Sequence, residues 1–212
     1  MDGNFGHMIS VFMGFLAIMN PVANVPIFLG LTSDDDRQTA ASVALRALLL
    51  AFLIVCLFSI LGKVIFELFG LSLPALRITG GLIVFVIGFH MLQGSSSSIH
   101  QPKEANQQQS RESALGVAVS PLAMPILAGP GTIATAMNFA AGGGLLKISM
   151  TIAAFAVLCV ITYAFFIFGE KFVTYIGASV VGAITRLMGL ILAVIGTQMV
   201  ITGIQGAFAL VK

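Results

Sequence analysis

Long apolar runs dominate this chain and limit what it can fold into. A helix needs about 20 apolar residues to cross the hydrocarbon core of a bilayer. Runs of that size occur at residues 7–31, 42–66, 74–93, 114–139, 146–169 and 179–207. With 58% hydrophobic and 8% charged residues, the chain lies outside the composition of soluble globular domains. We therefore expect an all-α, polytopic membrane protein with six transmembrane helices.

The charged and sulfur-containing residues point to no enzyme, metal or nucleic-acid chemistry. The net charge is +2, and the ten cations and eight acids mostly flank the apolar runs without forming a basic patch. Cys56 and Cys159 lie inside apolar runs with no CxxC spacing, as small buried side chains do. No Asp or Glu lies at the centre of a span, and nucleotide and metalloprotease motifs are missing. We expect no catalytic activity, no cofactor and no metal.

The two halves of the chain resemble each other. Residues 94–113 are rich in Ser, Gln and charge, and their composition predicts a flexible linker between a first repeat at 1–93 and a second at 114–212. The matching motifs are Phe58-x-Ile60-x-Gly62 with Phe165-x-Ile167-x-Gly169, 107 residues apart, and Arg77-x-x-Gly80 with Arg186-x-x-Gly189, 109 apart. Because each half has three spans, the second copy enters the membrane from the opposite side. The pattern predicts two inverted three-helix repeats.

Paired prolines interrupt the first and fourth spans. Each pair follows a residue that can cap a helix: Asn20 precedes Pro21 and Pro26, and Ser120 precedes Pro121 and Pro125. Proline suits the first position of a helix because its missing N–H costs nothing there. A restarted helix leaves unpaired N–H groups that favour an anion such as a carboxylate. The alternative is that the prolines only kink two packed helices.

The second break extends further along the chain than the first. Gly129, Pro130 and Gly131 continue the irregular backbone, and Thr132 brings a hydroxyl where another helix can restart. Thr132, Thr135 and Asn138 then fall along one helix face. We expect Ser120–Thr132 to carry more of the substrate contact than Asn20–Pro26.

Arg77 and Arg186 occupy equivalent places near the starts of the third and sixth spans. Each side chain either snorkels to water or reaches inward to guide a carboxylate. The glycines near them are expected to allow close packing of the helices; they are Gly80, Gly81, Gly88, Gly189 and Gly196.

Several segments resemble the MarC-like family of six-span integral membrane proteins, which are classed with neutral amino acid transporters. The resemblance rests on Asn20-Pro21-x-x-Asn24-x-Pro26, Arg77-Ile78-Thr79-Gly80-Gly81, Pro121-Leu122-Ala123-Met124-Pro125-Ile126-Leu127-Ala128-Gly129-Pro130-Gly131 and Thr185-Arg186-Leu187-Met188-Gly189-Leu190. Family members usually carry Gly in the middle of the first motif, and this chain has Ala23, which narrows the backbone approach by one methyl group. The resemblance implies a small neutral amino acid, such as glycine or alanine, as substrate.

The sequence thus predicts a secondary transporter that works by alternating access at a central broken-helix site. The partners would be a small neutral amino acid or similar polar solute, the lipid bilayer, a coupling ion, and a second copy of the chain if it forms a homo-oligomer. The alternatives are a passive channel, an exporter of another small polar solute, and a membrane-embedded enzyme. The distribution of charged residues argues against the enzyme. The predicted location is the cytoplasmic (inner) membrane, and six Lys and Arg residues against four favour both termini outside. The predicted substrate-binding residues are Asn20, Pro21, Asn24, Pro26, Arg77, Ser120, Pro121, Pro125, Gly129, Pro130, Gly131, Thr132, Thr135 and Arg186.

Overall fold

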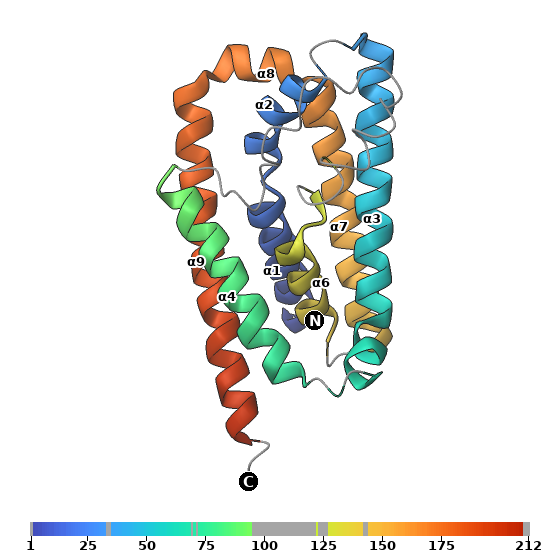
Figure 1. Cartoon of the computed structure of the whole chain (residues 1–212), viewed down its shortest axis with the longest axis vertical. Coiled ribbons are helices and arrows are strands. Elements are labelled where there is room, and N and C mark those ends of the chain that lie inside the picture. The colour runs from blue at the N-terminus through green and yellow to red at the C-terminus, as the bar shows by residue number, and fades with distance from the viewer. Residues whose placement is uncertain are drawn as a thin grey trace.

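The structure, a computed structural model, describes residues 2–32, 35–68, 70, 72–94, 122, 127–141 and 144–209. Regular structure in these ranges is helical throughout (Figure 1). The helices are α1 (Asp2–Met19), α2 (Pro21–Leu31), α3 (Arg37–Leu68), α4 (Leu73–Leu92), α6 (Pro130–Ala140), α7 (Gly144–Ile167), α8 (Gly169–Ile176) and α9 (Ala178–Ala209).

Five helical segments of the described residues are long and apolar enough to cross a membrane. They are Phe5–Leu31, Arg37–Gly62, Leu73–Leu92, Gly144–Ile167 and Ser179–Phe208, and they correspond to five of the predicted spans. The remaining predicted span, 114–139, falls mostly outside the described residues, which include its end as part of α6. The predicted linker, 94–113, also lies outside them apart from Gly94. An all-helical polytopic protein is therefore confirmed, whereas the sixth span stays a prediction.

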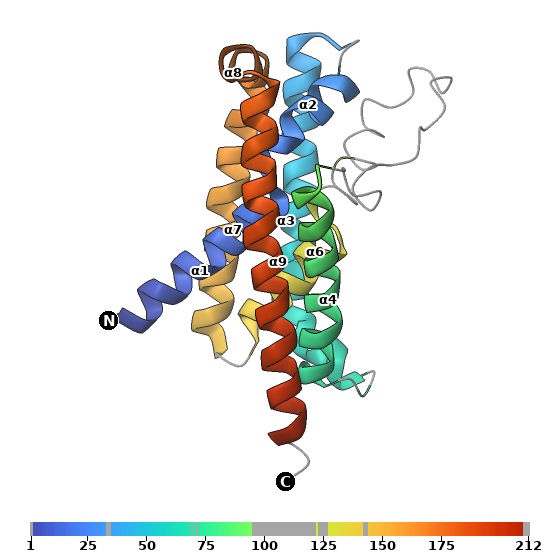
Figure 2. The same cartoon turned by 90° about the vertical axis from the view of Figure 1, so that its left-hand side faces the viewer.

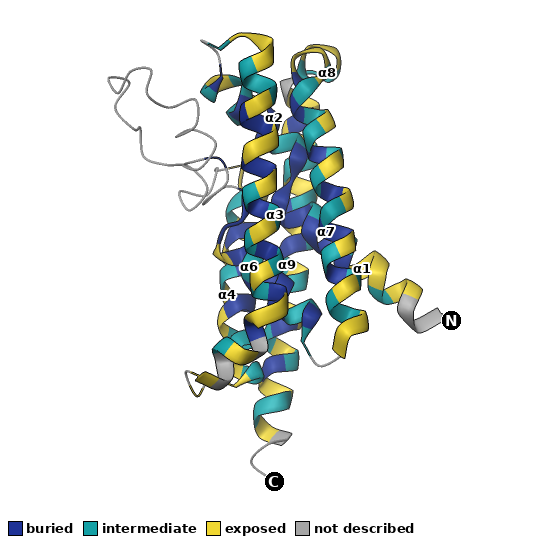
Figure 3. Cartoon of the chain, turned by 90° about the vertical axis from the view of Figure 1, so that its right-hand side faces the viewer, coloured by how far each residue is buried: buried dark blue, intermediate teal, exposed yellow. Residues whose placement is uncertain are grey.

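The outer faces of the long helices are apolar and exposed (Figure 3). Leu53 on α3, Val160 on α7 and Val194 on α9 are 60%, 70% and 61% exposed. Soluble monomers rarely expose so much contiguous apolar surface, whereas lipid tails accept it without cost. The burial pattern is that of a bundle whose solvent is the bilayer.

The first span is broken at Asn20, as predicted. Asn20 has φ 38° and ψ 72°, a left-handed conformation that ends α1, and its side chain caps α2. Pro21 follows as the first residue of α2, where its fixed φ suits a helix start. Phe28 then stacks on Phe166 of α7 with ring centroids 4.4 Å apart, which holds α2 against α7.

A helix also restarts in the second half, two residues before Thr132, where the sequence suggested a further restart beyond the one at Ser120–Pro121. The helix α6 begins at Pro130, with extended Gly129 before it and no side-chain cap, so Thr132 lies inside the first turn. Proline determines where α6 starts because its fixed φ fits the first helical position. A hydroxyl such as that of Thr132 can cap a helix, but a helix can also start without one. Both α2 and α6 have 11 residues and begin with proline, and Pro21 and Pro130 are 109 residues apart. The predicted restart at Ser120–Pro121 lies outside the described residues.

Glycines let α4 and α9 pack closely side by side along much of their length (Figures 1 and 2), as predicted. A Cβ added to Gly88 would lie 2.5 Å from the backbone nitrogen of Ala193, and one added to Gly196 would lie 2.5 Å from that of Phe85. Side-chain atoms never approach backbone so closely, so only glycine permits this separation. The contacts run antiparallel, since Gly81 meets Gly196 and Gly88 meets Gly189.

Two turns repeat between the halves as well. Gly70 before α4 has φ 64°, and Gly177 before α9 has φ 81°, a region that glycine enters without strain. These two glycines are 107 residues apart. The second spans of the two halves, α3 and α7, also pack against each other.

Candidate functional site

At the starts of the two short helices, Pro21, Gly129 and Gly131 are buried, and Pro130 is exposed. In Figure 1, α2 runs from the break toward the upper end of the view, and α6 runs from its first residue toward the lower end. A Cβ added to Gly131 would lie 2.6 Å from Cδ1 of Ile18, so the first turn of α6 packs on the last turn of α1. Two helix N-termini, each with unpaired N–H groups and a partial positive charge, therefore begin near the same break.

Backbone hydrogen bonds fix the position of Asn20 and use only part of its hydrogen-bonding capacity. Its N–H donates to the Leu16 carbonyl at 2.9 Å, and its Oδ1 accepts from the Ala23 N–H at 3.3 Å. The residue is 4% exposed, and its Nδ2 is buried with no hydrogen-bond partner among the described residues. A buried amide donor without a partner costs about 1–3 kcal/mol, which a bound acceptor would relieve.

Asn24 braces the backbone at the break. Its Nδ2 donates to the Met19 carbonyl at 2.6 Å and so satisfies a backbone group that the break leaves free. The side chain is 5% exposed. Asn24 therefore stabilises the broken backbone, and its amide N–H is already engaged there.

Thr132 and Thr135 bring two buried hydroxyls to the first turns of α6. They are 1% and 0% exposed, and neither Oγ1 has a hydrogen-bond partner among the described residues. Threonines elsewhere in these helices behave differently: Thr151, Thr162 and Thr185 each donate to the carbonyl four residues earlier at 2.8 Å. The two α6 hydroxyls do not make that bond.

The sequence analysis missed Ser59, a further buried hydroxyl. Ser59 on α3 is 4% exposed, and its Oγ has no partner among the described residues. It lies one turn before Gly62, whose added Cβ would be 2.9 Å from Cε of Met137 on α6. A single serine in an apolar run carries no pattern, and only the packing of α3 on α6 shows where it lies.

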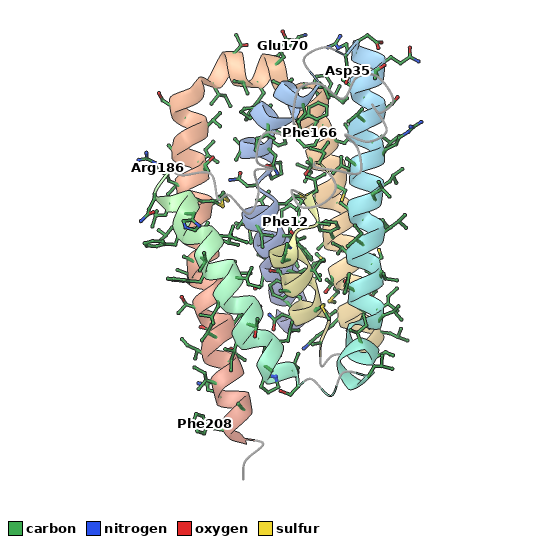
Figure 4. The ribbon with its side chains drawn as sticks, in the orientation of Figure 1. Phe12, Asp35, Phe166, Glu170, Arg186 and Phe208 are labelled. Carbon is green, nitrogen blue, oxygen red and sulfur yellow. The ribbon has the colours of Figure 1, made fainter. Side chains whose placement is uncertain are left out.

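The two arginines lie away from the break. Arg77 is half-buried, and its Nε donates to Oδ1 of Asn138 at 2.9 Å, which ties α4 to the far end of α6. Asn138 is eight residues after Pro130, or about 12 Å along the helix axis. Arg186 is exposed beside the end of α4 (Figure 4), where an added Cβ on Gly94 would lie 3.1 Å from its Nη2. Thus Arg77 reaches inward and Arg186 lies at the surface.

The other predicted site residues divide into buried, exposed and undescribed groups. Pro21, Gly129 and Gly131 are buried at the helix starts, whereas Pro26 and Pro130 are exposed. Ser120, Pro121 and Pro125 lie outside the described residues. Among the side chains whose burial the structure describes, the buried polar ones include no Asp, Glu, Lys or Arg. Of the described groups at the break, the helix N-termini supply positive potential.

Comparison with known proteins identifies the family. Residues 5–208 match the family described as MarC family integral membrane protein. The chain belongs to the MarC family. Its relatives include the membrane protein YvbG of Bacillus subtilis, 36% identical over 205 residues that cover 96% of this chain and 97% of the relative. YhcE of Escherichia coli is 31% identical over 201 residues that cover 93% of this chain and 91% of the relative.

The inner membrane protein MarC of Escherichia coli is 33% identical over 201 residues, which cover 89% of this chain and 90% of MarC. No solved structure matches the chain. The family resemblance noted from the sequence motifs is therefore confirmed over nearly the whole chain, and the protein is an integral membrane protein.

Proposed function

We propose that this protein is a secondary transporter that moves a small neutral amino acid across the cytoplasmic membrane by alternating access. One observation carries the proposal: two half-helices begin beside one break, where Asn20, Thr132 and Thr135 keep buried polar atoms without partners among the described residues. Such groups are rare in the interior of a membrane protein because lipid offers them nothing. They are expected where a polar solute binds.

The chemistry of the site suits a zwitterion. A carboxylate would accept hydrogen bonds from the first-turn N–H groups of α2 and α6, from Asn20 Nδ2 and from the threonine hydroxyls. The hydroxyl oxygens also accept, so they suit the ammonium end. No described buried side chain carries a charge, which favours a ligand of zero net charge. The class of neutral amino acid is the one that the MarC-like resemblance implies.

An inverted repeat would supply the alternating motion, with residues 1–93 and 114–212 as the two copies. Four matches support this arrangement: α2 with α6, Gly70 with Gly177, the Arg77 motif with the Arg186 motif, and the antiparallel pairing of α4 with α9. In the α4–α9 pairing, the contact of Gly81 with Gly196 and that of Gly88 with Gly189 exchange if 81 is equivalent to 189 and 88 to 196, an offset of 108 that differs by one residue from that of the Arg77 and Arg186 motifs. That exchange is what a two-fold axis in the membrane plane would produce.

Counterflow in proteoliposomes tests the proposal. Vesicles preloaded with glycine or alanine should take up the radiolabelled amino acid transiently, and uptake should saturate with external concentration. The variant Thr132→Val should lose at least about tenfold in uptake, the factor that corresponds to 1.4 kcal/mol.

The matched control is Thr197→Val, because Thr197 is exposed on α9 and already donates to the Ala193 carbonyl at 2.9 Å. Its uptake should equal that of the wild type. Flux without saturation or counterflow would instead indicate a passive channel, and absence of flux for every neutral amino acid would overturn the substrate class.

A further inference from the structure

A polar cavity lies at the opposite end of α6 from the break. It has a volume of about 200 Å³ and forms where α1, α4, α6, α7 and α9 meet. Its polar lining comes from residues spread over the whole chain: His7, Arg77, Asn138, Lys147, Gln198 and Thr202. One water molecule takes up about 30 Å³ in the liquid, so this cavity is large enough for a small ion with part of its hydration shell.

The charges around this cavity have one sign. Arg77 comes from the first turns of α4 and Lys147 from the first turn of α7, and both side chains are half-buried. Among the described side chains, no carboxylate forms an ion pair with either residue. Two cations that line one cavity repel each other, and an anion between them would be attracted to both. The cavity therefore has the electrostatics of an anion site.

Hydrogen-bond donors in the cavity are oriented and still available. The bond from Arg77 Nε to Asn138 Oδ1 at 2.9 Å fixes the plane of the guanidinium and leaves its two Nη groups as donors. His7 stands edge-on to Phe139, with ring centroids 6.0 Å apart, and its Nε2 is buried without a partner in the described part of the chain. A fixed guanidinium fork and an unpaired imidazole nitrogen are groups that recognise oxygen anions.

We propose that this cavity binds one small oxyanion, a carboxylate or a phosphate group, through Arg77 and Lys147. The site is separate from the proposed transport site, and its existence does not depend on transport. A phosphate group has two sources at a membrane surface: a free ion in solution and the headgroup of an anionic lipid.

Anion binding to the purified protein in phosphatidylcholine nanodiscs tests the free-ion source. Titration with inorganic phosphate and with acetate, followed by calorimetry and by the thermal unfolding midpoint, should give saturable binding. Lys147→Gln should weaken the apparent affinity about tenfold. The matched control Lys171→Gln removes an exposed charge on α8, away from the cavity, and should leave the affinity unchanged.

Native mass spectrometry in nanodiscs that also contain phosphatidylglycerol tests the lipid source. Retention of phosphatidylglycerol by the wild type and its loss in Lys147→Gln would assign the site to a lipid headgroup. Phosphate or acetate binding without lipid retention would assign it to a free ion. The variant Arg77→Gln removes the second cation, and Lys147→Gln stands alone if that variant does not fold.

Absence of anion binding and of lipid retention in the wild type would overturn the proposal, and so would equal binding by wild type and Lys147→Gln. The variant Thr132→Val separates this result from the transport proposal, because it should retain anion binding at the cavity even where uptake is lost.

Discussion

Asn20 shows how one residue can both break a helix and keep a polar group free. It is the only residue other than glycine with positive φ in the described part of the chain. Asparagine tolerates the left-handed region better than most residues, and its Oδ1 caps α2 at the same time. The backbone thus uses one end of the amide, and Nδ2 has no partner among the described residues.

Replacing Asn20 should separate stability from function. Asn20→Ala should destabilise the protein by about 2 kcal/mol, because alanine loses the cap and pays left-handed strain of about 1–2 kcal/mol. Asn20→Gly should cost less than about 1 kcal/mol, since glycine adopts this φ freely. Thermal unfolding in detergent measures the difference, and both variants should lose uptake because both lack Nδ2. Equal unfolding midpoints for the two variants would contradict the assigned strain.

For Thr135 we predict that a substitution raises stability, whereas the Asn20 substitutions lower it. A valine of the same shape removes a buried hydroxyl that has no partner among the described residues, so Thr135→Val should raise stability by about 1 kcal/mol while uptake falls. Thr162→Val is the matched control, because Thr162 is equally buried but donates to the Leu158 carbonyl at 2.8 Å. That variant should not be stabilised. Thermal unfolding and uptake on the same preparations measure both effects, and a destabilised Thr135→Val would mean that its hydroxyl has a structural partner.

At the level of elements, the close packing of α4 on α9 depends on glycine at particular positions. Glycines at a spacing of seven on each helix, at 81 and 88 and at 189, 196 and 203, bring the two backbones into contact. A stripe of small residues favours association of two helices in lipid. The hydrophobic effect is absent there, and close van der Waals packing drives association instead. The pair forms the largest part of the interface between the two proposed repeats, so changes in it affect the whole bundle.

Adding a single methyl group should disrupt this pair. In Gly88→Ala the new Cβ would lie 2.5 Å from the backbone nitrogen of Ala193, so the helices must separate, at a cost of about 1–3 kcal/mol. Gly182→Ala is the matched control, since its Cβ would meet no atom within 4 Å. Alanine favours helix over glycine by about 1 kcal/mol, so the control should be neutral or stabilised. Thermal unfolding in detergent compares the two, and an unaffected Gly88→Ala would mean that the helices lie further apart.

The start of α3 gives a pH-dependent prediction. Hydrogen bonds from the Thr39 side chain and the Gln38 backbone N–H lower the pKa of Asp36 below its ordinary value of 3.8. Because the folded pKa lies below the unfolded one, the stabilisation is present above about pH 4 and is lost as pH falls through the folded pKa. Asp36→Ala should therefore lower the unfolding midpoint at pH 7 and do so less near pH 3. A constant difference across this range would show that the cap is not carboxylate-dependent.

At the scale of the whole molecule, the bundle places equivalent connections at opposite ends. Asp35 after α2 and Glu170 in α8 lie at the same end of the bundle (Figure 4). Leu145, at the start of α7 and 86% exposed, lies toward the other end, because α7 runs up from it to α8. An odd number of spans per repeat requires this arrangement.

Thiol labelling of intact cells tests the topology. In a background where Cys56 and Cys159 are replaced by alanine, Asp35→Cys and Glu170→Cys should react with an impermeant maleimide from the same side, and Leu145→Cys from the opposite side. If both termini are outside, the cytoplasmic side carries Asp35 and Glu170. Labelling of Asp35→Cys and Leu145→Cys from one side would contradict the inverted repeat.

Features that depend on local chemistry could be predicted from the residues alone: the apolar spans, the break at Asn20–Pro21 and the small-residue faces of α4 and α9. Hydropathy and proline stereochemistry act within a few residues, and a glycine face is visible in the sequence although the helix that packs on it is not. Helix packing added the rest: the start of α6 lies beside the end of α1, Thr132, Thr135 and Ser59 have hydroxyls without partners among the described residues, and Arg77 meets Asn138. Whether a buried polar atom finds a hydrogen-bond partner depends on the helix that packs against it. The residues of one helix do not predict which helix that will be.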